Sequence, residues 1–483
     1  MKQKLSLMPF RFEPLGRGAV VVNDCGGWLA LSAKEFKALK TGGFARDKAL
    51  SSKLSAAGFI KERLDVERLC GDLRGLYRHT FSGPSLHILA VTDRCNHACV
   101  YCRAVENSSG GGRAAAGMMS RETAKKSVDM AFSSPSDSIA LEFQGGEALL
   151  NWPVVRCAID YALKKNRSAA RRLEISVVTN LSLMDEEKFS FLAARGAGIC
   201  TSLDGPAFIH DANRRWRGGS SYAAAAGWLK KAVARAAPPG KDALPSALMT
   251  TTRLSLRHPL EIIETYRALG LGGIFLRPLS PIGFARDVWG EIGYRPREYV
   301  AFYRRALKHI IGLNRRGERF VERNAAIIAA KALKKEDPNY LDLRSPCGAA
   351  IGQLAYRWDG GVYTCDEGRM AGSGRDDFFR LGSVHKNSYR EIIGAPAAAV
   401  CAMASCLENQ SACQRCAWKP FCGVCPVHNY ETQGTPWGDM AAGGWCEIQK
   451  GVFAAVFEAL SKPADRAVIE GWLAAAEGAR RQG

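Results

Sequence analysis

The sequence predicts an α/β fold in which helices cover a parallel sheet, and two observations in residues 85–315 lead to this prediction. Amphipathic helical patterns such as 120–132 and 258–270 alternate with apolar runs that have the length and composition of buried strands. Such alternation implies a parallel sheet with right-handed crossovers. A closed barrel of this kind needs eight units, so the six found here predict a partial (β/α)6 barrel over residues 85–320. The runs are 86–92, 139–143, 173–179, 198–203, 245–251 and 273–279.

The chemically distinctive residues follow the ends of these predicted strands. Ligands of parallel α/β sheets bind at the carboxyl ends of the strands. The sequence therefore predicts one site along this edge. Its candidates are Cys95, Cys99 and Cys102 after the first strand, Gly145, Gly146 and Glu147 after the second, Asn180 after the third, Ser202 on the fourth and Arg277 on the sixth. A loop rich in glycine and alanine, 106–117, follows the cysteines and is expected to be mobile.

Residues 1–84 are expected to form a small α+β domain. Two apolar runs, 19–23 and 28–32, are joined by DCGG and predict a hairpin. Two helical patterns follow, within 33–42 and 48–60. This order resembles a winged-helix-like peptide-recognition module.

The C-terminal third has a different character. Residues 340–450 are rich in cysteine and glycine and have few long periodic segments, so metal sites could replace a large apolar core there. Residues 451–483 show helical periodicity and are expected to form one or two closing helices.

The composition of the chain indicates which partners and which cellular compartment to expect. The 67 basic and 47 acidic residues give a net charge of +20, which suits an acidic partner. The basic residues are scattered over helical faces and not interleaved with aromatic residues, so a general preference for arginine explains the charge better than nucleic-acid binding. Neither a secretory signal nor a membrane-spanning run is recognisable. We expect a cytoplasmic protein whose 16 cysteines serve metal or redox chemistry.

The stretch CNHACVYC, residues 95–102, carries three thiols. Thiolates select zinc or iron–sulfur clusters, and structural zinc takes four ligands. A cubane cluster has four irons, so three thiolates leave one iron open for a small molecule. The three cysteines therefore favour a cluster with an exchangeable fourth ligand.

These residues resemble the radical S-adenosylmethionine (radical SAM) superfamily. The spacing of the three cysteines, with an aromatic residue at Tyr101, matches its cluster motif, and the segments EFQGGEALL (142–150), SLDGP (202–206) and HDANR (210–214) match other motifs. The resemblance implies that Cys95, Cys99 and Cys102 hold a [4Fe-4S] cluster. Its open iron would be chelated by the amino and carboxylate groups of SAM.

The same resemblance implies which residues surround SAM. In this family the glycines of the GGE motif let the backbone approach the methionyl amine. Ser202 and Arg214 are candidate contacts of the SAM carboxylate, because arginine suits bidentate carboxylate binding; a structural salt bridge is the alternative for Arg214. The expected cofactor-binding set is Tyr101, Gly145, Gly146, Glu147, Asn180, Ser202 and Arg214.

The late cysteines resemble the SPASM domain of peptide-modifying radical SAM enzymes. Their pattern is C-x12-G-x4-C from Cys347 to Cys365, then C-x2-C-x5-C-x2-C from Cys413 to Cys425, then Cys446; the last CxxC gap is one residue shorter than usual. The resemblance implies two auxiliary iron–sulfur clusters, and a pair of zinc sites is the alternative. The expected ligands are Cys413, Cys416, Cys422 and Cys446 for one cluster, and Cys347, Cys365 and Cys425 for the other, with Cys401, Cys406 or an open position as its fourth ligand.

Asp366 directly follows Cys365. The corresponding aspartate is the proposed base in sulfatase-maturing relatives, and a carboxylate beside a cluster is suited to accept a substrate proton. A solvated loop acid is an equal alternative. Asp366 is the one catalytic residue that the sequence suggests.

Nearly the whole chain resembles the His-Xaa-Ser system radical SAM maturase of the B type, through MPFRFEPLG, VNDCGGWLALS, VTDRCNHACVYCRA and CAWKPFCGVCPV. That likeness implies a ribosomally made peptide with His-Xaa-Ser repeats, a partner radical SAM protein of the C type and a low-potential electron donor. One alternative is an anaerobic sulfatase-maturing enzyme that makes formylglycine. The other is a zinc protein that binds nucleic acid without catalysis.

Overall fold

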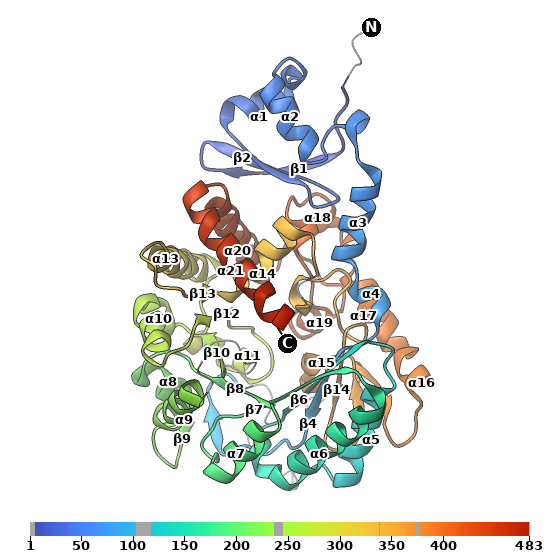
Figure 1. Ribbon diagram of the computed structural model, residues 1–483, viewed down its shortest axis with the longest axis vertical. Coiled ribbons are helices and arrows are strands. Elements are labelled where there is room, and N and C mark those ends of the chain that lie inside the picture. Colours follow the sequence, from blue (N-terminus) through green and yellow to red (C-terminus); the bar gives the residue numbers. More distant parts are fainter. Residues whose placement is uncertain (1–4, 103–116, 236–244, 338, 372–375, 483) are drawn as a thin grey trace.

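A computed structural model describes residues 5–102, 117–235, 245–337, 339–371 and 376–482. Apart from Gly117, the glycine- and alanine-rich loop 106–117 lies outside the described residues. The N-terminal residues form a lobe at one end of the molecule, and a large sheet with surrounding helices forms the rest (Figure 1).

The N-terminal lobe is a three-stranded antiparallel sheet in the order β1-β2-β3, packed against two helices. The predicted hairpin is present as β2 and β3, whereas β1 was not predicted. Residues including Val21, Phe44, Leu54 and Phe59 form a core of their own in this lobe. The elements are β1 (Phe10–Leu15), β2 (Gly18–Asn23), β3 (Trp28–Leu31), α1 (Ala33–Lys40) and α2 (Lys48–Ala56), and α3 (Val66–Leu76) and α4 (His79–Ser82) lead to the main sheet.

Six parallel strands form the centre of the molecule in chain order, which confirms the predicted α/β partial barrel. In the described part of the chain β12 pairs only with β10, so the barrel is open at that edge. The sixth predicted strand is split, and its first part, β11 (Gly273–Ile274), pairs with β13 (Val321–Glu322) instead. The six strands are β4 (Leu86–Ala90), β6 (Ser138–Gln144), β7 (Arg172–Val178), β8 (Gly198–Ser202), β10 (Ser246–Thr251) and β12 (Leu276–Pro278).

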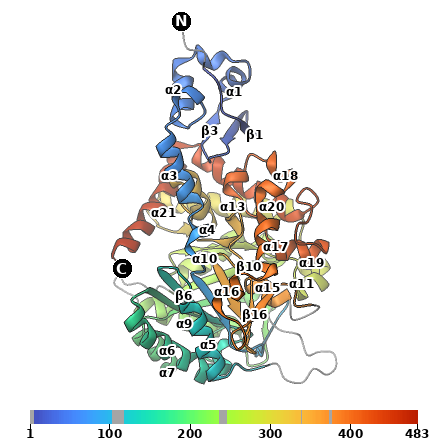
Figure 2. The same cartoon turned by 90° about the vertical axis from the view of Figure 1, so that its right-hand side faces the viewer.

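Helices cover the outer face of this sheet (Figures 1 and 2). Strand residues such as Leu141, Phe143 and Met249 share one buried core with helix residues such as Val128 and Ile159. The helices are α5 (Arg121–Phe132), α6 (Trp152–Ala169), α7 (Glu186–Ala194), α8 (Ala207–Asn213), α9 (Ser221–Arg235), α10 (Pro259–Ala268), α11 (Phe284–Asp287), α12 (Trp289–Ile292), α13 (Pro296–Arg315) and α14 (Arg323–Ala329). Among the described helices, none is long and apolar enough to cross a membrane.

The cysteine-rich region does not form a separate sheet. Its strands β14 (Gln353–Tyr356), β15 (Gly361–Tyr363) and β16 (Arg380–Ser383) extend the main sheet beyond β4, and β14 pairs with β4 in parallel. The predicted boundary at residue 451 falls inside α20, which begins seven residues earlier at Gly444. The helices are α15 (Asp366–Ala371), α16 (Tyr389–Ile393), α17 (Pro396–Ser405), α18 (Ser411–Gln414), α19 (Pro426–Gln433), α20 (Gly444–Leu460) and α21 (Pro463–Gln482).

Candidate functional site

The three cysteines of CNHACVYC lie in the loop that follows β4, at the carboxyl edge of the sheet. A short strand in this loop, β5 (His97–Cys99), pairs with β9 (Arg214–Trp216), so Cys99 lies opposite Arg214. The His97 amide donates to Cys95 Sγ at 3.4 Å, and the Cys102 amide donates to the Cys99 carbonyl at 3.1 Å. Backbone hydrogen bonds therefore set the relative positions of the three thiols.

The chemistry of this set fits an iron–sulfur cluster. Burial raises the pKa of Cys95 to about 12, and nearby Cys99 and Cys102 add to the effect. Burial also raises the pKa of Cys99 to about 11, although Arg214 acts in the opposite direction. The thiols thus lie close together in a poorly solvated place, where iron rather than solvent would stabilise their anionic form.

A buried carboxylate, Asp204, joins the cysteine loop to the end of β8. Its Oδ2 accepts from the Tyr101 hydroxyl at 2.5 Å and from Arg214 Nε at 3.3 Å. Arg214 also lies 5.2 Å from the centre of the Tyr101 ring and donates to Cys99 Sγ at 4.0 Å. Arg214 thus has the internal ion pair that was its alternative role, and its contact with a SAM carboxylate stays a prediction.

The two glycines of the GGE motif allow a close approach of backbone to backbone. A Cβ atom on Gly145 would lie 2.2 Å from the Thr92 carbonyl oxygen, and one on Gly146 would lie 2.2 Å from that of Arg94. The Gly146 and Glu147 amides donate to the same two carbonyls at 2.7 and 2.8 Å. The glycines therefore hold the end of β6 against the segment that leads into Cys95. Backbone packing thus explains why glycine is needed at both positions, in addition to the expected approach to SAM.

Glu147 is buried and ties the ends of β6 and β7 together. Its Oε1 accepts from the Leu149 amide at 2.9 Å and from the Thr179 hydroxyl at 2.6 Å. Its Oε2 accepts from the Asn180 amide at 2.8 Å. Burial raises the pKa of Glu147, and these hydrogen bonds act against that rise. Glu147 thus has internal partners for both oxygens.

Asn180 connects β7 to the cysteine loop. Its side-chain amide donates to Asn96 Oδ1 at 2.9 Å, and its own oxygen accepts from the Ser182 hydroxyl at 2.6 Å. Ser202 is half-buried at the end of β8, where it pairs with Leu248 of β10. The structure places both residues along the expected edge, and their contact with SAM stays a prediction.

A charged cluster that the sequence did not reveal lies around Asp366. Arg369 is buried and donates to Asp366 Oδ1 at 2.9 Å, and it also lies 3.8 Å from Asp93, which precedes Cys95 by two residues. Arg277 lies 3.5 Å from Glu367. Asp366 therefore belongs to a network of charges, and it is not an isolated loop acid.

Glu142 is the acid that sequence reasoning missed. Burial raises its pKa to about 7, nearby Asp366 adds to the rise, and a hydrogen bond with Ser176 opposes it. The residues before and after it on β6, Leu141 and Phe143, are fully buried. The sequence did contain a signal for Glu142, which is a charged residue inside an otherwise apolar strand. Side chains alternate between the two faces of a strand, so Glu142 lies on the face opposite to Leu141 and Phe143.

The late cysteines fall into two sets. The first set combines Cys413, Cys416 and Cys422 with Cys446 from the first turn of α20. Burial raises the pKa of Cys422, and Cys416, Cys413 and Cys446 raise it further, so the four thiols are neighbours. The second set contains Cys347, Cys365 and Cys425: burial raises the pKa of Cys425, and Cys347 adds to the rise. Their role as cluster ligands stays a prediction.

Helix starts orient two thiols of the second set. The Gly368 amide, in α15, donates to Cys365 Sγ at 3.3 Å. The His428 amide, in α19, donates to Cys425 Sγ at 3.4 Å. Such amide bonds to sulfur tune the potential of a cluster. Within the described residues, no three Cys, His, Asp or Glu side chains are close enough to hold a single metal ion; in a cubane each thiolate binds a different iron, so its ligands lie farther apart.

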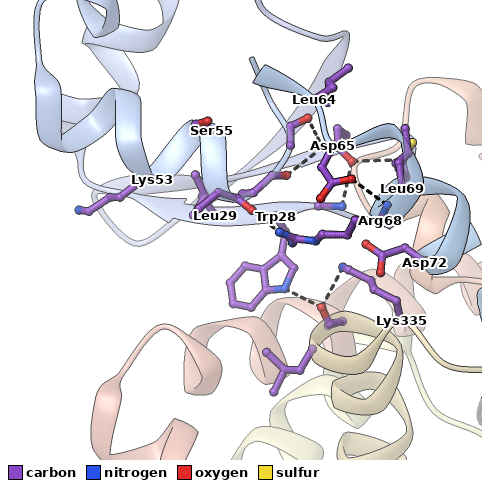
Figure 3. Close-up of a pocket in the computed structure, with 18 of the residues that line it drawn as sticks. Trp28, Leu29, Lys53, Ser55, Leu64, Asp65, Arg68, Leu69, Asp72 and Lys335 are labelled. Carbon is purple, nitrogen blue, oxygen red and sulfur yellow. Dashed lines mark hydrogen bonds between the residues drawn. The ribbon is translucent and has the colours of Figure 1, made fainter. Parts of the chain in front are cut away.

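A cavity of about 620 Å³ lies between the N-terminal lobe and the C-terminal helices (Figure 3). Strand β3 contributes Trp28, Leu29 and Ala30 to its wall. The Trp28 indole N–H donates to the Ala332 carbonyl at 3.1 Å, and its ring packs edge-on against Phe457 at 4.8 Å. The charged lining residues are Lys53, Arg63, Asp65, Arg68, Asp72, Lys335 and Arg466. Lys53 and Arg466 are paired with Glu35 and Glu470, so the remaining basic residues exceed the two acidic ones by a single charge.

Comparison with known proteins shows which sequences this chain is similar to. Residues 89–242 match the Radical SAM superfamily. An uncharacterized protein from Methanocaldococcus jannaschii is 28% identical over 132 residues, which are 27% of this chain and 42% of that protein. A cysteine-type anaerobic sulfatase-maturating enzyme from Clostridium perfringens is 23% identical over 353 residues, which are 70% of this chain and 87% of the enzyme.

Two solved structures have the same fold. Native anSMEcpe with bound AdoMet matches with a TM-score of 0.65 at 19% identity, over 80% of this chain and 99% of that chain. SuiB from Streptococcus suis, bound to the precursor peptide SuiA, matches with a TM-score of 0.52 at 13% identity, over 90% of this chain and 98% of that chain. Since residues 89–242 match the superfamily and the sheet matches these structures, the chain has the radical SAM fold.

Proposed function

We propose that this protein is a radical SAM enzyme that modifies a residue of a ribosomally synthesised peptide. The observation that carries the proposal is the position of Cys95, Cys99 and Cys102. They lie together at the carboxyl edge of the sheet, inside the segment that matches the superfamily. When bound, the [4Fe-4S] cluster and SAM would supply the radical chemistry: SAM is cleaved reductively into methionine and a 5′-deoxyadenosyl radical, and this radical abstracts a hydrogen atom from the substrate.

The chain's own residues would position these reactants. The Asp204 carboxylate holds the ring of Tyr101 and the guanidinium of Arg214 against the cysteine loop. Glu147 holds the Asn180 backbone at the neighbouring strand end. Asp366 would accept a substrate proton at its carboxylate, with Arg369 stabilising the anionic form before transfer.

The N-terminal lobe would bind the peptide. Among the described strands, β3 pairs only with β2, and it lines the cavity of Figure 3, so an extended peptide segment has a strand edge to join. Arg63, Arg68 and Lys335 favour a segment that carries acidic residues. The solved structure of SuiB with the precursor peptide SuiA, a protein of the same fold, supports a peptide as the substrate class.

The finer proposal is maturation of a His-Xaa-Ser peptide. It is supported by the sequence resemblance to the B-type maturases and implies cooperation with a partner radical SAM protein and a low-potential electron donor. Because the thiols that would bind iron must stay reduced, the reducing cytoplasm is the proposed site of action.

Sulfatase maturation is the second candidate. The similarity to the Clostridium perfringens enzyme over 70% of this chain favours it. The N-terminal lobe, which has a core of its own and forms one wall of the cavity, favours the peptide maturase instead. The alternative of a zinc protein does not explain the superfamily match over residues 89–242.

Anaerobic reconstitution with iron and sulfide, followed by SAM and dithionite, tests the proposal. Wild-type protein should release 5′-deoxyadenosine, and a variant with Cys95, Cys99 and Cys102 changed to Ala should not. Absence of deoxyadenosine from an iron-loaded wild type would refute the enzyme assignment. Mass spectrometry of a His-Xaa-Ser peptide and of a sulfatase-derived cysteine peptide after turnover separates the two candidates, since formylglycine forms only on the second.

A further inference from the structure

Helix α17 places one more cysteine beside the second auxiliary set. Cys401 is only 1% exposed and lies in the same buried cluster as Cys347 and Cys365, against which Cys425 also packs. The four thiols come from four separate parts of the region: the segment before β14, the segment after β15, helix α17 and the start of α19. Such convergence from distant positions is typical of a ligand set and not of a local sequence repeat.

Two hydroxyl groups connect Cys401 to the other thiols. The Thr364 hydroxyl donates to Cys365 Sγ at 3.9 Å and is also close enough to interact with the Cys401 thiol. The Ser405 hydroxyl donates to the Cys401 carbonyl at 2.6 Å and accepts from the Cys347 amide at 2.9 Å. Helix α17 is therefore fixed to both the Cys347 and the Cys365 segments.

Cys406 has different surroundings, although it is only five residues farther along the chain. It caps the C-terminal end of α17 and is half-buried. Its thiol donates to Glu408 Oε2 at 3.1 Å, and Glu408 forms an ion pair with Lys419 at 3.1 Å. Cys406 thus has a polar partner on the surface, whereas Cys401 faces the other thiols.

We propose that Cys401 is the fourth thiolate ligand of the iron–sulfur cluster held by Cys347, Cys365 and Cys425. This inference rests on the proposed function, which supplies the cluster. On binding, the Cys401 thiol loses its proton to solvent and forms an Fe–S bond, and the exogenous hydroxide or thiol leaves that iron. No electron is transferred in this step. With four protein ligands the cluster has no open iron, so it would transfer electrons and not bind the peptide.

The test uses the variant in which Cys95, Cys99 and Cys102 are Ala, so that only auxiliary clusters remain. Cys401→Ala, Cys401→Ser and Cys406→Ala are added to it separately. Each protein is reconstituted anaerobically, its iron and sulfide are measured per chain, and electron paramagnetic resonance spectra are recorded after reduction and after mild oxidation. Circular dichroism and the unfolding midpoint of the metal-free proteins show whether each variant folds.

We expect Cys401→Ala to lose up to half of the roughly eight auxiliary iron atoms or to give a three-iron signal on oxidation. Cys401→Ser should keep more iron with a changed spectrum, because oxygen replaces sulfur on one iron. Cys406→Ala should match the parent. If both Cys401 variants match Cys406→Ala in iron and spectrum, the assignment is wrong. If the parent itself binds no iron, both the auxiliary clusters and the assignment of Cys401 are refuted. Deoxyadenosine release by the wild type tests the proposed function separately.

Discussion

Replacing Asp204 with asparagine tests whether one buried carboxylate supports the cysteine loop. Asp204 is fully buried, and the side chain of its ionic partner, Arg214, is 11% exposed. Besides Arg214, its oxygens accept from the Tyr101 hydroxyl at 2.5 Å, from Asn213 Nδ2 at 3.1 Å and from the Thr250 amide at 3.2 Å. Asparagine keeps the shape but removes the charge and one acceptor, which leaves Arg214 as an uncompensated buried cation.

The expected loss of stability follows from this burial. Removing one partner of a buried ion pair costs about 3–5 kcal/mol, because the remaining charge is neither solvated nor paired. Asp160→Asn is the matched control. Asp160 also pairs with an arginine, Arg195, at 2.6 Å, but its side chain is 47% exposed. Surface pairs of this kind contribute about 0–1 kcal/mol. The two substitutions are chemically identical, so their difference reports the burial of the ion pair together with the three further hydrogen bonds of Asp204.

Urea unfolding of the cluster-free proteins, followed by tryptophan fluorescence, gives the two changes in free energy. The reconstituted proteins are then compared for iron bound per chain, and Asp204→Asn should bind less because the Tyr101 side of the loop is released. A difference of less than about 1 kcal/mol between the two variants would refute the reasoning, since the buried pair would then be no stronger than a surface pair.

Three further changes test other parts of the structure. Glu142→Gln should remove a pH dependence: the folded pKa of about 7 exceeds the usual 4.5, so wild-type stability falls by about 3 kcal/mol as the pH rises from 4.5 to 7, and unfolding curves of the variant should lack this fall. Gly146→Ala should lower iron binding, because its Cβ would meet the Arg94 carbonyl oxygen at 2.2 Å, whereas Gly71→Ala, with nothing within 4 Å, should not. Trp28→Ala should loosen the N-terminal lobe and increase its cleavage in limited proteolysis, while peptide-independent deoxyadenosine release stays unchanged.

The parallel strands were predictable because each is a local apolar run followed by a turn and a helix. Strands β14, β15 and β16 were not, since each has only three or four residues. Strand β14 pairs with β4, more than 250 residues earlier in the chain, as in the register Leu354↔His87, and β15 and β16 follow from β14. Such long-range pairing leaves no periodicity in the sequence. The split of the sixth strand has the same origin, because β11 pairs with a strand that lies beyond α13.

For the site, spacing identified the cysteines but not the groups that support them. The CxxxCxxC and CxxC patterns are local, so the cysteines within each pattern could be assigned to one site from the sequence alone. The partners of Asp204 and the charges around Asp366 come together only through the fold. The sequence left Cys401 and Cys406 as equal candidates, because both lie on or next to the same helix. They differ in the side of α17 that each faces, and this depends on the tertiary contacts of Thr364 and Ser405.

The shared sheet determines how the two cysteine regions are placed relative to each other. Strand β4 leads into Cys95, its neighbour β14 pairs with β15, and β15 leads into Cys365. The buried His87 on β4 also hydrogen-bonds the Tyr356 hydroxyl on β14 at 2.9 Å, and Trp358 donates to Asp93 at 2.5 Å. Changing the separation of the two sites would break these bonds. The N-terminal lobe is held to the rest of the molecule as well, because Val20 and Val22 of β2 lie in the main core while Val21 lies in the core of the lobe.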